Sequence, residues 1–301
     1  MDYWKLGLGA SICAAAAFVV ASCSGGGMET MPGDAGDSGR KDDATTLDGP
    51  VVDSFAWPDC NSMPAGAKVQ TLPQIWQDNP SKPIETWVSG VYVTAVSRGG
   101  CMSGQACDIY VQQDLTYASL AAAAKHGLKI FVSAATAQYF TGIAVGDKVD
   151  LLGWAWRYNL DGQNELLLQV NLQLPGCFKK TGSGTATPVI AQLTDFSVNA
   201  YEQTLGPVLV EVDGVSGTPQ NADQTFGLYK TGMFNDGGLA SVTSLSPFFL
   251  QGGVFTTLTK GMKYNFTRVI GVFGLFVPPT DASMPTKYME IYPRTSADIV
   301  P

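Results

Sequence analysis

Few residues in this chain are suited to acid–base, nucleophilic or metal chemistry. Among its 301 residues there is one histidine, His126, in an Ala-Lys-His-Gly segment at the start of a predicted strand. A serine triad needs a positioned base, and a metal-dependent phosphodiesterase needs several histidines and carboxylates. The Lys180-Thr-Gly182 triplet has no S-x-x-K partner of the β-lactamase type. The sequence therefore predicts no catalytic residues, no metal site and no cofactor.

Carboxylates are the one catalytic group that remains, because a pair of them is sufficient for glycoside hydrolysis. Asp147, Asp161 and Asp236 fall in predicted turns, whereas Asp150 and Glu165 fall on predicted strands. No pair is predicted to face another across a cleft. We therefore expect a protein that is not an enzyme, and we keep a carboxylate-only glycosidase and an enzyme of unrecognised type as alternatives.

The first 22 residues have the pattern of an export signal. Lys5 precedes an uncharged, mostly apolar run from Leu6 to Ala21, which is short for a membrane-spanning helix. The run ends in Val20-Ala-Ser-Cys23, which resembles the signal of bacterial lipoproteins, whose cysteine takes a diacylglycerol on its sulfur. The resemblance implies lipidation of Cys23 and, because Ser24 follows it, the periplasmic or outer face of the outer membrane. An ordinary secretory signal with a chance cysteine is the alternative.

Residues 23–59 are rich in Gly, Asp, Ser, Pro and Thr. They include eight acidic and two basic residues, and so carry most of the chain's net charge of −8. A segment without hydrophobic periodicity cannot offset the entropy cost of ordering. We therefore expect a disordered tether, spanning roughly 35 Å as a flexible coil. The rest of the chain is then close to neutral.

Four cysteines follow this tether: Cys60, Cys101, Cys107 and Cys177. An even number in an oxidising compartment predicts disulfide bonds. Cys101 and Cys107 lie six residues apart in a Gly/Ser-rich loop, so we expect them to pair, which leaves Cys60 to pair with Cys177. A zinc site is the alternative, but the chain has no C-x-x-C spacing and only one imidazole.

From residue 85 onward, apolar and polar residues alternate as they do in strands. Gly90 predicts a bulge or sharp bend inside the first strand, and Gly153 lies inside the fourth. Five strands in this pattern favour a small Greek-key barrel of the OB type, with a plain five- or six-stranded sandwich as the alternative. The expected strands are 85–97, 108–112, 127–132, 148–158 and 165–170, with a short helical stretch within 114–126.

The same pattern recurs at an offset of about 115–120 residues. Residues 88–93 correspond to 207–215, and 146–154 correspond to 261–272. The runs V-x-G-V-x-V-T-A-V, I-Y-V-Q and V-G-D-K-V-D-L-L-G resemble the OB-like domains of bacterial surface lipoproteins and secreted nucleases. In those nucleases such domains often stand beside an endonuclease/exonuclease/phosphatase-type catalytic domain, which this chain lacks.

We therefore predict an all-β protein with two OB-like Greek-key barrels in tandem after a disordered tether. The expected parts are a lipoprotein signal peptide (1–22), an acidic tether (23–59), a first OB-like domain (60–178), a linker (179–200) and a second OB-like domain (201–301).

The strongest candidates for ligand contact are outward-facing side chains of the first barrel. OB barrels often bind ligands on the face of their second and third strands, where bases or sugars stack on aromatic rings. We expect inward-facing positions at Ile109, Val111, Leu128, Ile130 and Val132, so that their neighbours face outward. The candidates are Tyr110, Gln112, Lys129 and Phe131, with Trp154, Trp156, Arg157 and Tyr158 beside them. The alternative is that the rings pack against the second domain, which is the commoner use of such residues.

Charge disfavours nonspecific nucleic-acid binding, which usually needs a basic patch. Residues 85–172 include five bases and seven acids, and residues 195–301 include six bases and nine acids. We therefore predict a lipid-anchored, non-catalytic envelope lipoprotein whose domains bind or scaffold a polysaccharide, protein or nucleic-acid partner. An accessory substrate-binding subunit of an extracellular nuclease or polysaccharide-degrading system is the alternative. The sequence leaves the oligomeric state open.

Lipidation of Cys23 gives the first testable prediction. Changing Cys23 to Ala should move the protein from the membrane to the soluble fraction, because each buried lipid CH₂ contributes ~0.8 kcal/mol to membrane binding. Fractionation of cells that express the wild type and the variant is the measurement. Membrane association of the variant at the wild-type level would rule out the lipid anchor.

Overall fold

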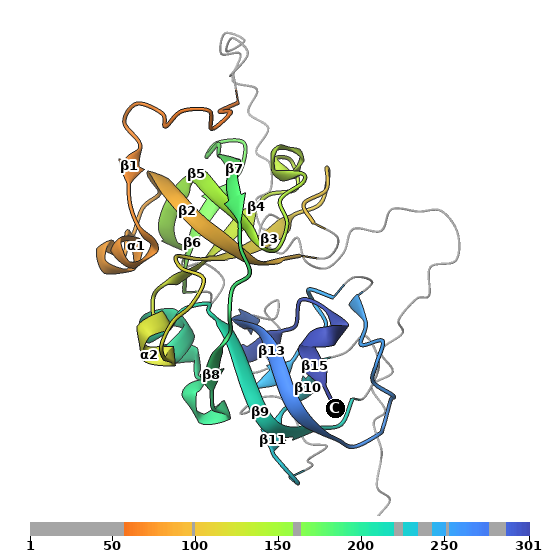
Figure 1. Ribbon diagram of the computed structural model, residues 1–301. Coiled ribbons are helices and arrows are strands. Elements are labelled where there is room, and N and C mark those ends of the chain that lie inside the picture. Colours follow the sequence, from red (N-terminus) through yellow and green to blue (C-terminus); the bar gives the residue numbers. More distant parts are fainter. Residues whose placement is uncertain are drawn as a thin grey trace, which may run out of the picture. The chain divides into compact units, whose positions relative to one another are not determined.

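The computed structural model describes residues 57–97, 100–158, 164–219, 225–233, 243–250, 253–276 and 287–301 (Figure 1). The predictions for the signal peptide, Cys23 and nearly all of the tether lie outside these residues. The described chain consists mainly of strands in two sheets, with short helices between them. In these ranges, no helix is long and apolar enough to cross a membrane.

The first sheet closes into a five-stranded barrel. Its strands pair in the order β2-β3-β4-β6-β5, and β5 pairs back with β2. β4 and β6 run parallel, and the other neighbours run antiparallel. This Greek-key order is that of an OB barrel, as predicted, and not that of a sandwich. The five strands are β2 (Ile84–Val96), β3 (Cys107–Gln112), β4 (Gly127–Val132), β5 (Asp147–Tyr158) and β6 (Glu165–Val170).

The predicted bulge at Gly90 is confirmed, and it lies in β2, the strand that pairs with both β5 and β3. The register of β2 against β5 shifts between Val88 and Val91. Gly90 has a φ of 69°, in the left-handed region that glycine adopts at little cost. Its N–H donates to Asp150 Oδ1 at 2.8 Å. The first part of β2 therefore pairs with β5, while its end pairs with β3.

Two short edge strands and three helical segments surround this barrel. β1 (Lys68–Val69) runs parallel to β2, and β7 (Cys177–Ser183) runs antiparallel to β5. The helical segments are α1 (Leu72–Asp78), α2 (Leu120–Ala123) and the 3₁₀ turn η1 (Ala137–Phe140). Of these, α2 lies in the stretch where the sequence predicts a short helix.

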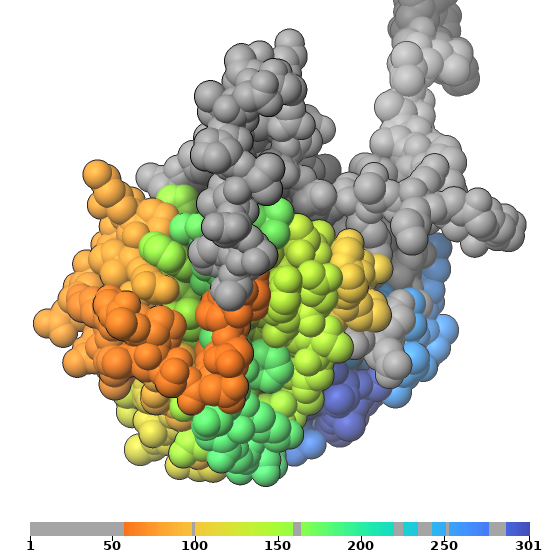
Figure 2. All heavy atoms as spheres, turned by 90° about the horizontal axis from the view of Figure 1, so that it is seen from above, coloured from red at the N-terminus to blue at the C-terminus, as the bar shows by residue number. Residues whose placement is uncertain are grey.

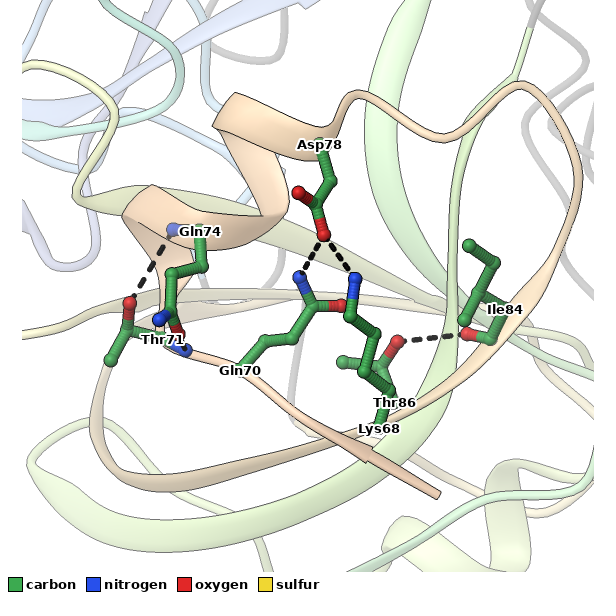
Figure 3. Close-up of polar contacts among 7 residues, drawn as sticks. All are labelled: Lys68, Gln70, Thr71, Gln74, Asp78, Ile84 and Thr86. Atoms are coloured by element: carbon green, nitrogen blue, oxygen red, sulfur yellow. Dashed lines mark hydrogen bonds and ion pairs between the residues drawn. The ribbon is translucent and has the colours of Figure 1, made fainter. Parts of the chain in front are cut away.

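Polar contacts fix α1 at both ends (Figure 3). At its start, the Thr71 hydroxyl accepts from Gln74 N, and Gln74 Oε1 accepts from Thr71 N at 2.8 Å, which is a capping box. At its end, the Asp78 carboxylate accepts from Lys68 Nζ and from Gln70 Nε2. The helix is thereby held against β1, with its apolar side chains in the barrel core.

The second sheet has the same strand order as the first. Its strands pair as β10-β12-β14-β13-β9-β11. Only Leu228 separates β10 from β11, so the segment 226–230 supplies both ends of this order. It pairs with β12 on one side and with β9 on the other, and it corresponds to β3 of the first barrel. The barrel strands are β9 (Leu209–Gly217), β10 (Phe226–Gly227), β11 (Tyr229–Lys230), β12 (Ser244–Leu245), β13 (Tyr264–Phe276) and β14 (Tyr288–Tyr292).

The correspondence between the two copies extends to the edges of the sheets. β8 (Val189–Ala191) runs parallel to β9 as β1 does to β2, and β15 (Ile299–Val300) pairs with β13 as β7 does with β5. The π-helix η3 (Ala200–Thr204) lies between β8 and β9, where the first copy has α1. The 3₁₀ turns η2 (Leu193–Asp195) and η6 (Ser296–Asp298) complete the second copy. The predicted internal repeat is therefore confirmed.

The predicted linker, residues 179–200, is instead largely ordered into secondary structure. It includes most of β7, all of β8 and η2, and the first residue of η3. Only residues 184–188 lie between β7 of the first sheet and β8 of the second. The prediction missed β8 because three residues are too few to show a strand period.

Both predicted disulfides are present, Cys60–Cys177 and Cys101–Cys107. The first joins residues 117 apart in sequence, so its covalent loop encloses all five strands of the first barrel. Figure 2 shows the orange atoms of this N-terminal part next to green atoms from later in the first copy. The start of the described chain is thus tied to the strand that leads to the second copy.

Loop length predicts how much each disulfide contributes. Replacing Cys60 and Cys177 together by Ser should lower the free energy of unfolding by roughly 4–5 kcal/mol in the loop-entropy model, because the closed loop is long. The matched control, Cys101 and Cys107 replaced by Ser, opens a short loop and should cost about 2 kcal/mol. Urea denaturation of both variants is the measurement. Equal losses would contradict this account.

Candidate functional site on the outside of the first barrel

Strand register builds a continuous outer face from β3, β4, β6 and β5. The predicted inward positions, such as Ile109 and Leu128, are in the barrel core, so the alternate residues face outward. Cross-strand pairing arranges the outward residues in rows. One row is Asp108, Phe131, Gln169 and Trp154, and the next is Tyr110, Lys129, Leu167 and Trp156.

One half of this face is covered by residues of the second copy. Tyr110 is 3% exposed, and its ring meets Phe249 edge-on at 5.3 Å between centroids and lies 6.3 Å from the Tyr292 ring. The same cluster includes Leu209, Ile270 and Val272. Tyr110 therefore follows the packing alternative and is not open to a ligand. Gln112, also expected to contact ligand, is buried and donates from Nε2 to Asp114 O at 2.6 Å.

Lys129 lies in this covered half and is bound by two carboxylates. Its Nζ is 3.1 Å from Glu165 Oε2 and 3.5 Å from Asp108 Oδ1. Tyr201 of η3 donates its hydroxyl proton to Glu165 Oε1. Burial opposes the charge on Lys129, but the two carboxylates outweigh it and hold the pKa of Lys129 well above its usual range. Lys129 is therefore a structural cation, and it links β3, β4 and β6 to η3.

Another buried carboxylate lies on the second sheet. Glu290 on β14 is 5% exposed, and burial raises its pKa to about 7, although hydrogen bonds with Tyr292, Ser246 and Thr225 partly offset this. Tyr292 in turn lies beside Tyr110. Sequence reasoning missed Tyr201, Tyr292 and Glu290, because nothing in a strand pattern indicates which distant segment covers an outward face.

The other half of the face is partly open and aromatic. Phe131, Trp154 and Trp156 are all partly exposed, as is Gln169 between them. Trp154 Nε1 donates to Pro175 O at 3.0 Å, and Trp156 Nε1 donates to Gln169 Oε1 at 3.0 Å. We call Phe131, Gln169, Trp154 and Trp156 the aromatic strip. The indole N–H groups are used inside the protein, so the ring surfaces are what the strip offers to a ligand.

The two remaining predicted residues lie next to the strip with different roles. The ring of Tyr158 meets Trp156 edge-on at 5.3 Å and supports it. Arg157 donates to Asn79 Oδ1, to Asn164 O and to Glu202 O, and it lies over the Trp76 ring. Arg157 thus joins the end of α1, the start of β6 and η3, and it is not a ligand contact.

The side-chain contacts of His126 in the described chain are with Asp114 and Tyr117. Its Nδ1 is 3.9 Å from Asp114 Oδ2, and its ring meets Tyr117 edge-on at 5.2 Å. Asp114 itself is largely exposed. Within the described ranges, no group of three or more His, Cys, Asp and Glu side chains could hold a metal ion.

Comparison with known proteins adds little to this description. No protein-family model matches the chain, and no curated protein matches it. Among solved structures, it is similar to a replication protein A heterotrimer bound to single-stranded DNA, with 10% identity and a TM-score of 0.24. The match covers 55% of this chain and 38% of that chain. The OB assignment therefore depends on the strand order of the chain itself.

The division of the outer face predicts unequal mutational costs. Tyr110→Ala should lower the free energy of unfolding by roughly 3 kcal/mol or more, because it removes a buried ring. Phe131→Ala, on the next strand but partly exposed, should cost only about 1 kcal/mol. Chemical denaturation measures both. Equal costs would show that the two rings share one environment.

Glu290 predicts a pH dependence of stability. Its folded pKa is about 7, above the ordinary 4.5, so the folded state holds a proton that the unfolded state has lost between these values. The stability contributed by this proton is complete below pH 4.5 and is lost as the pH rises through 7, by up to about 1.4 kcal/mol per pH unit.

Denaturation of the wild type and of Glu290→Gln from pH 4 to pH 8 is the measurement. The variant should show a flatter profile in this range, whereas Glu211→Gln, on β9, should keep the wild-type slope. A wild-type slope in Glu290→Gln would contradict the assignment.

Proposed function

We propose that this protein is a non-catalytic envelope lipoprotein, anchored through Cys23, that binds an extended polymer on the aromatic strip. The observation that carries the proposal is the strip itself, with three partly exposed rings gathered on one outer face. The Val20-Ala-Ser-Cys23 pattern supports the anchor. The scarcity of acid–base groups supports a binding role in place of catalysis.

The spacing of the rings favours an extended ligand. Phe131 on β4 and Trp154 on β5 are separated by one intervening strand, β6, so their Cα atoms lie about 10 Å apart. A single small ring cannot stack on both. Contact with the whole strip therefore requires a chain with several flat units, such as a polysaccharide or a single-stranded nucleic acid.

The fixed orientation of the rings also favours binding. Each indole is held by a hydrogen bond to the protein, and Tyr158 supports Trp156 from the side. Side chains that are ordered before binding lose less conformational entropy when a ligand arrives. The Lys129 cluster beside the strip adds to this order, because it joins β3, β4 and β6.

The accessory-subunit alternative uses the same strip. In that case, the protein would hold a polymer for a separate nuclease or polysaccharide-degrading enzyme. Its support is the sequence resemblance to OB-like domains that accompany nucleases. It differs from the leading proposal only in requiring a catalytic partner.

A polymer-retention assay tests the proposed function. Phe131→Ala and Trp156→Ala should each weaken retention on the polymer that the wild type binds by roughly 5- to 100-fold, the effect of losing one stacked ring. Tyr139→Ala is the matched control, because Tyr139 is an exposed aromatic residue of the same barrel outside the strip. Equal retention of all variants would refute binding at the strip.

A further inference from the structure

The charges around the aromatic strip constrain what it can bind. Three basic residues lie on the described strands β3, β4, β5 and β6: Lys129, Lys148 and Arg157. Lys129 is shared by Asp108 and Glu165. Arg157 is held by Asn79, Asn164 and Glu202 O.

Lys148 lies over the Tyr92 ring at 5.3 Å, near the opposite end of β5 from the tryptophans. None of the three cations is therefore placed to pair with an anionic ligand on the strip.

Carboxylates, in contrast, lie next to the rings. Asp108 is the cross-strand neighbour of Phe131, and Glu165 is the cross-strand neighbour of Tyr158. Both carboxylates contact the single cation Lys129, so the cluster has no free cation to offer an anionic ligand. A polyanion on the strip would find no unengaged cation on β3, β4, β5 or β6, whereas nucleic-acid binding is driven mainly by cations that contact phosphates.

The hydrogen-bonding group within the strip suits hydroxyl groups. Gln169 lies between Phe131 and Trp154 in one row of the sheet. Gln169 Oε1 accepts a hydrogen bond from Trp156 Nε1. The amide N–H groups of Gln169 therefore point away from that indole. A neutral donor between two rings can bind a sugar hydroxyl while the rings contact the C–H faces of neighbouring sugar units.

We infer that the ligand of the aromatic strip is an uncharged glycan chain. This inference rests on the proposed function, since it names the polymer class that the strip would take. Phe131 and the two tryptophans contact the flat faces of sugar rings, and Gln169 binds a hydroxyl between them. Lys129 is already engaged by Asp108 and Glu165, which disfavours nucleic acids and acidic polysaccharides on the strip.

Affinity electrophoresis of the detergent-solubilised full chain tests this inference. The probes are five neutral soluble polysaccharides (laminarin, xyloglucan, glucomannan, dextran and soluble starch) and two acidic ones (alginate and heparin). A 20-nucleotide single-stranded oligothymidine is tested by fluorescence anisotropy. We expect at least one neutral glycan to retard the protein, and no measurable binding of the three polyanions.

The variants connect binding to the strip. Phe131→Ala and Gln169→Ala should each reduce retardation by the neutral glycan at least fivefold, and Tyr139→Ala should leave it unchanged. Melting curves of each variant control for unfolding, and Gln169→Ala keeps all three rings.

The possible failures are distinguishable. Binding of oligothymidine or an acidic polysaccharide that Phe131→Ala abolishes would overturn the glycan inference while supporting a polymer-binding strip. Neutral-glycan binding that no strip variant weakens would overturn both proposals, as would the absence of binding to every probe.

Discussion

The ion cluster around Lys129 is the interaction on which the described structure depends most. A lysine this well covered needs carboxylate partners, because an unpaired buried charge is strongly unfavourable. Asp108 and Glu165 supply them from the strands on either side of β4, and Tyr201 satisfies the remaining side of Glu165. Tyr201 belongs to the second copy, so the first barrel completes this cluster only with the second copy in contact. Half of the outer face of the first barrel is therefore used to join the two copies and is not open to a ligand.

The internal repeat shows how one fold can serve two uses. Both copies have an edge strand, a short helix and a barrel with the same strand order, yet their outer faces differ. In the second copy, the outward side chains of β13 and β14 include Val272 and Tyr292, which pack on Tyr110 and its neighbours. Gly274 leaves room for the Tyr292 ring, since a Cβ there would come within 2.0 Å of it. The first copy keeps the Phe131 and Trp154 side of its face partly open.

Sequence reasoning could predict what depends on local pattern. Alternation located the barrel strands and their inward positions, the glycine inside the first strand marked its bulge, and the cysteine count with loop spacing predicted both disulfides. The same alternation placed the candidate residues on one face but could not divide that face. Tyr110 and Phe131 have equivalent positions in the pattern, and what separates them is Phe249 and Tyr292, more than 100 residues away. Sequence reasoning missed Gln169, because its role depends on Phe131 and Trp154, which strand register places on either side of it.

One outer face of the first barrel has a half that the second copy buries and a half that is partly open. Hydroxyl-radical footprinting of the full chain, read by mass spectrometry at single residues, tests this division most directly because oxidation follows side-chain exposure. Phe131, Trp154 and Trp156 should be oxidised rapidly. Tyr110, Tyr201 and Tyr292 should be strongly protected. Oxidation of Tyr110 at the rate of Phe131, or protection of the tryptophans equal to that of Tyr201, would contradict this division.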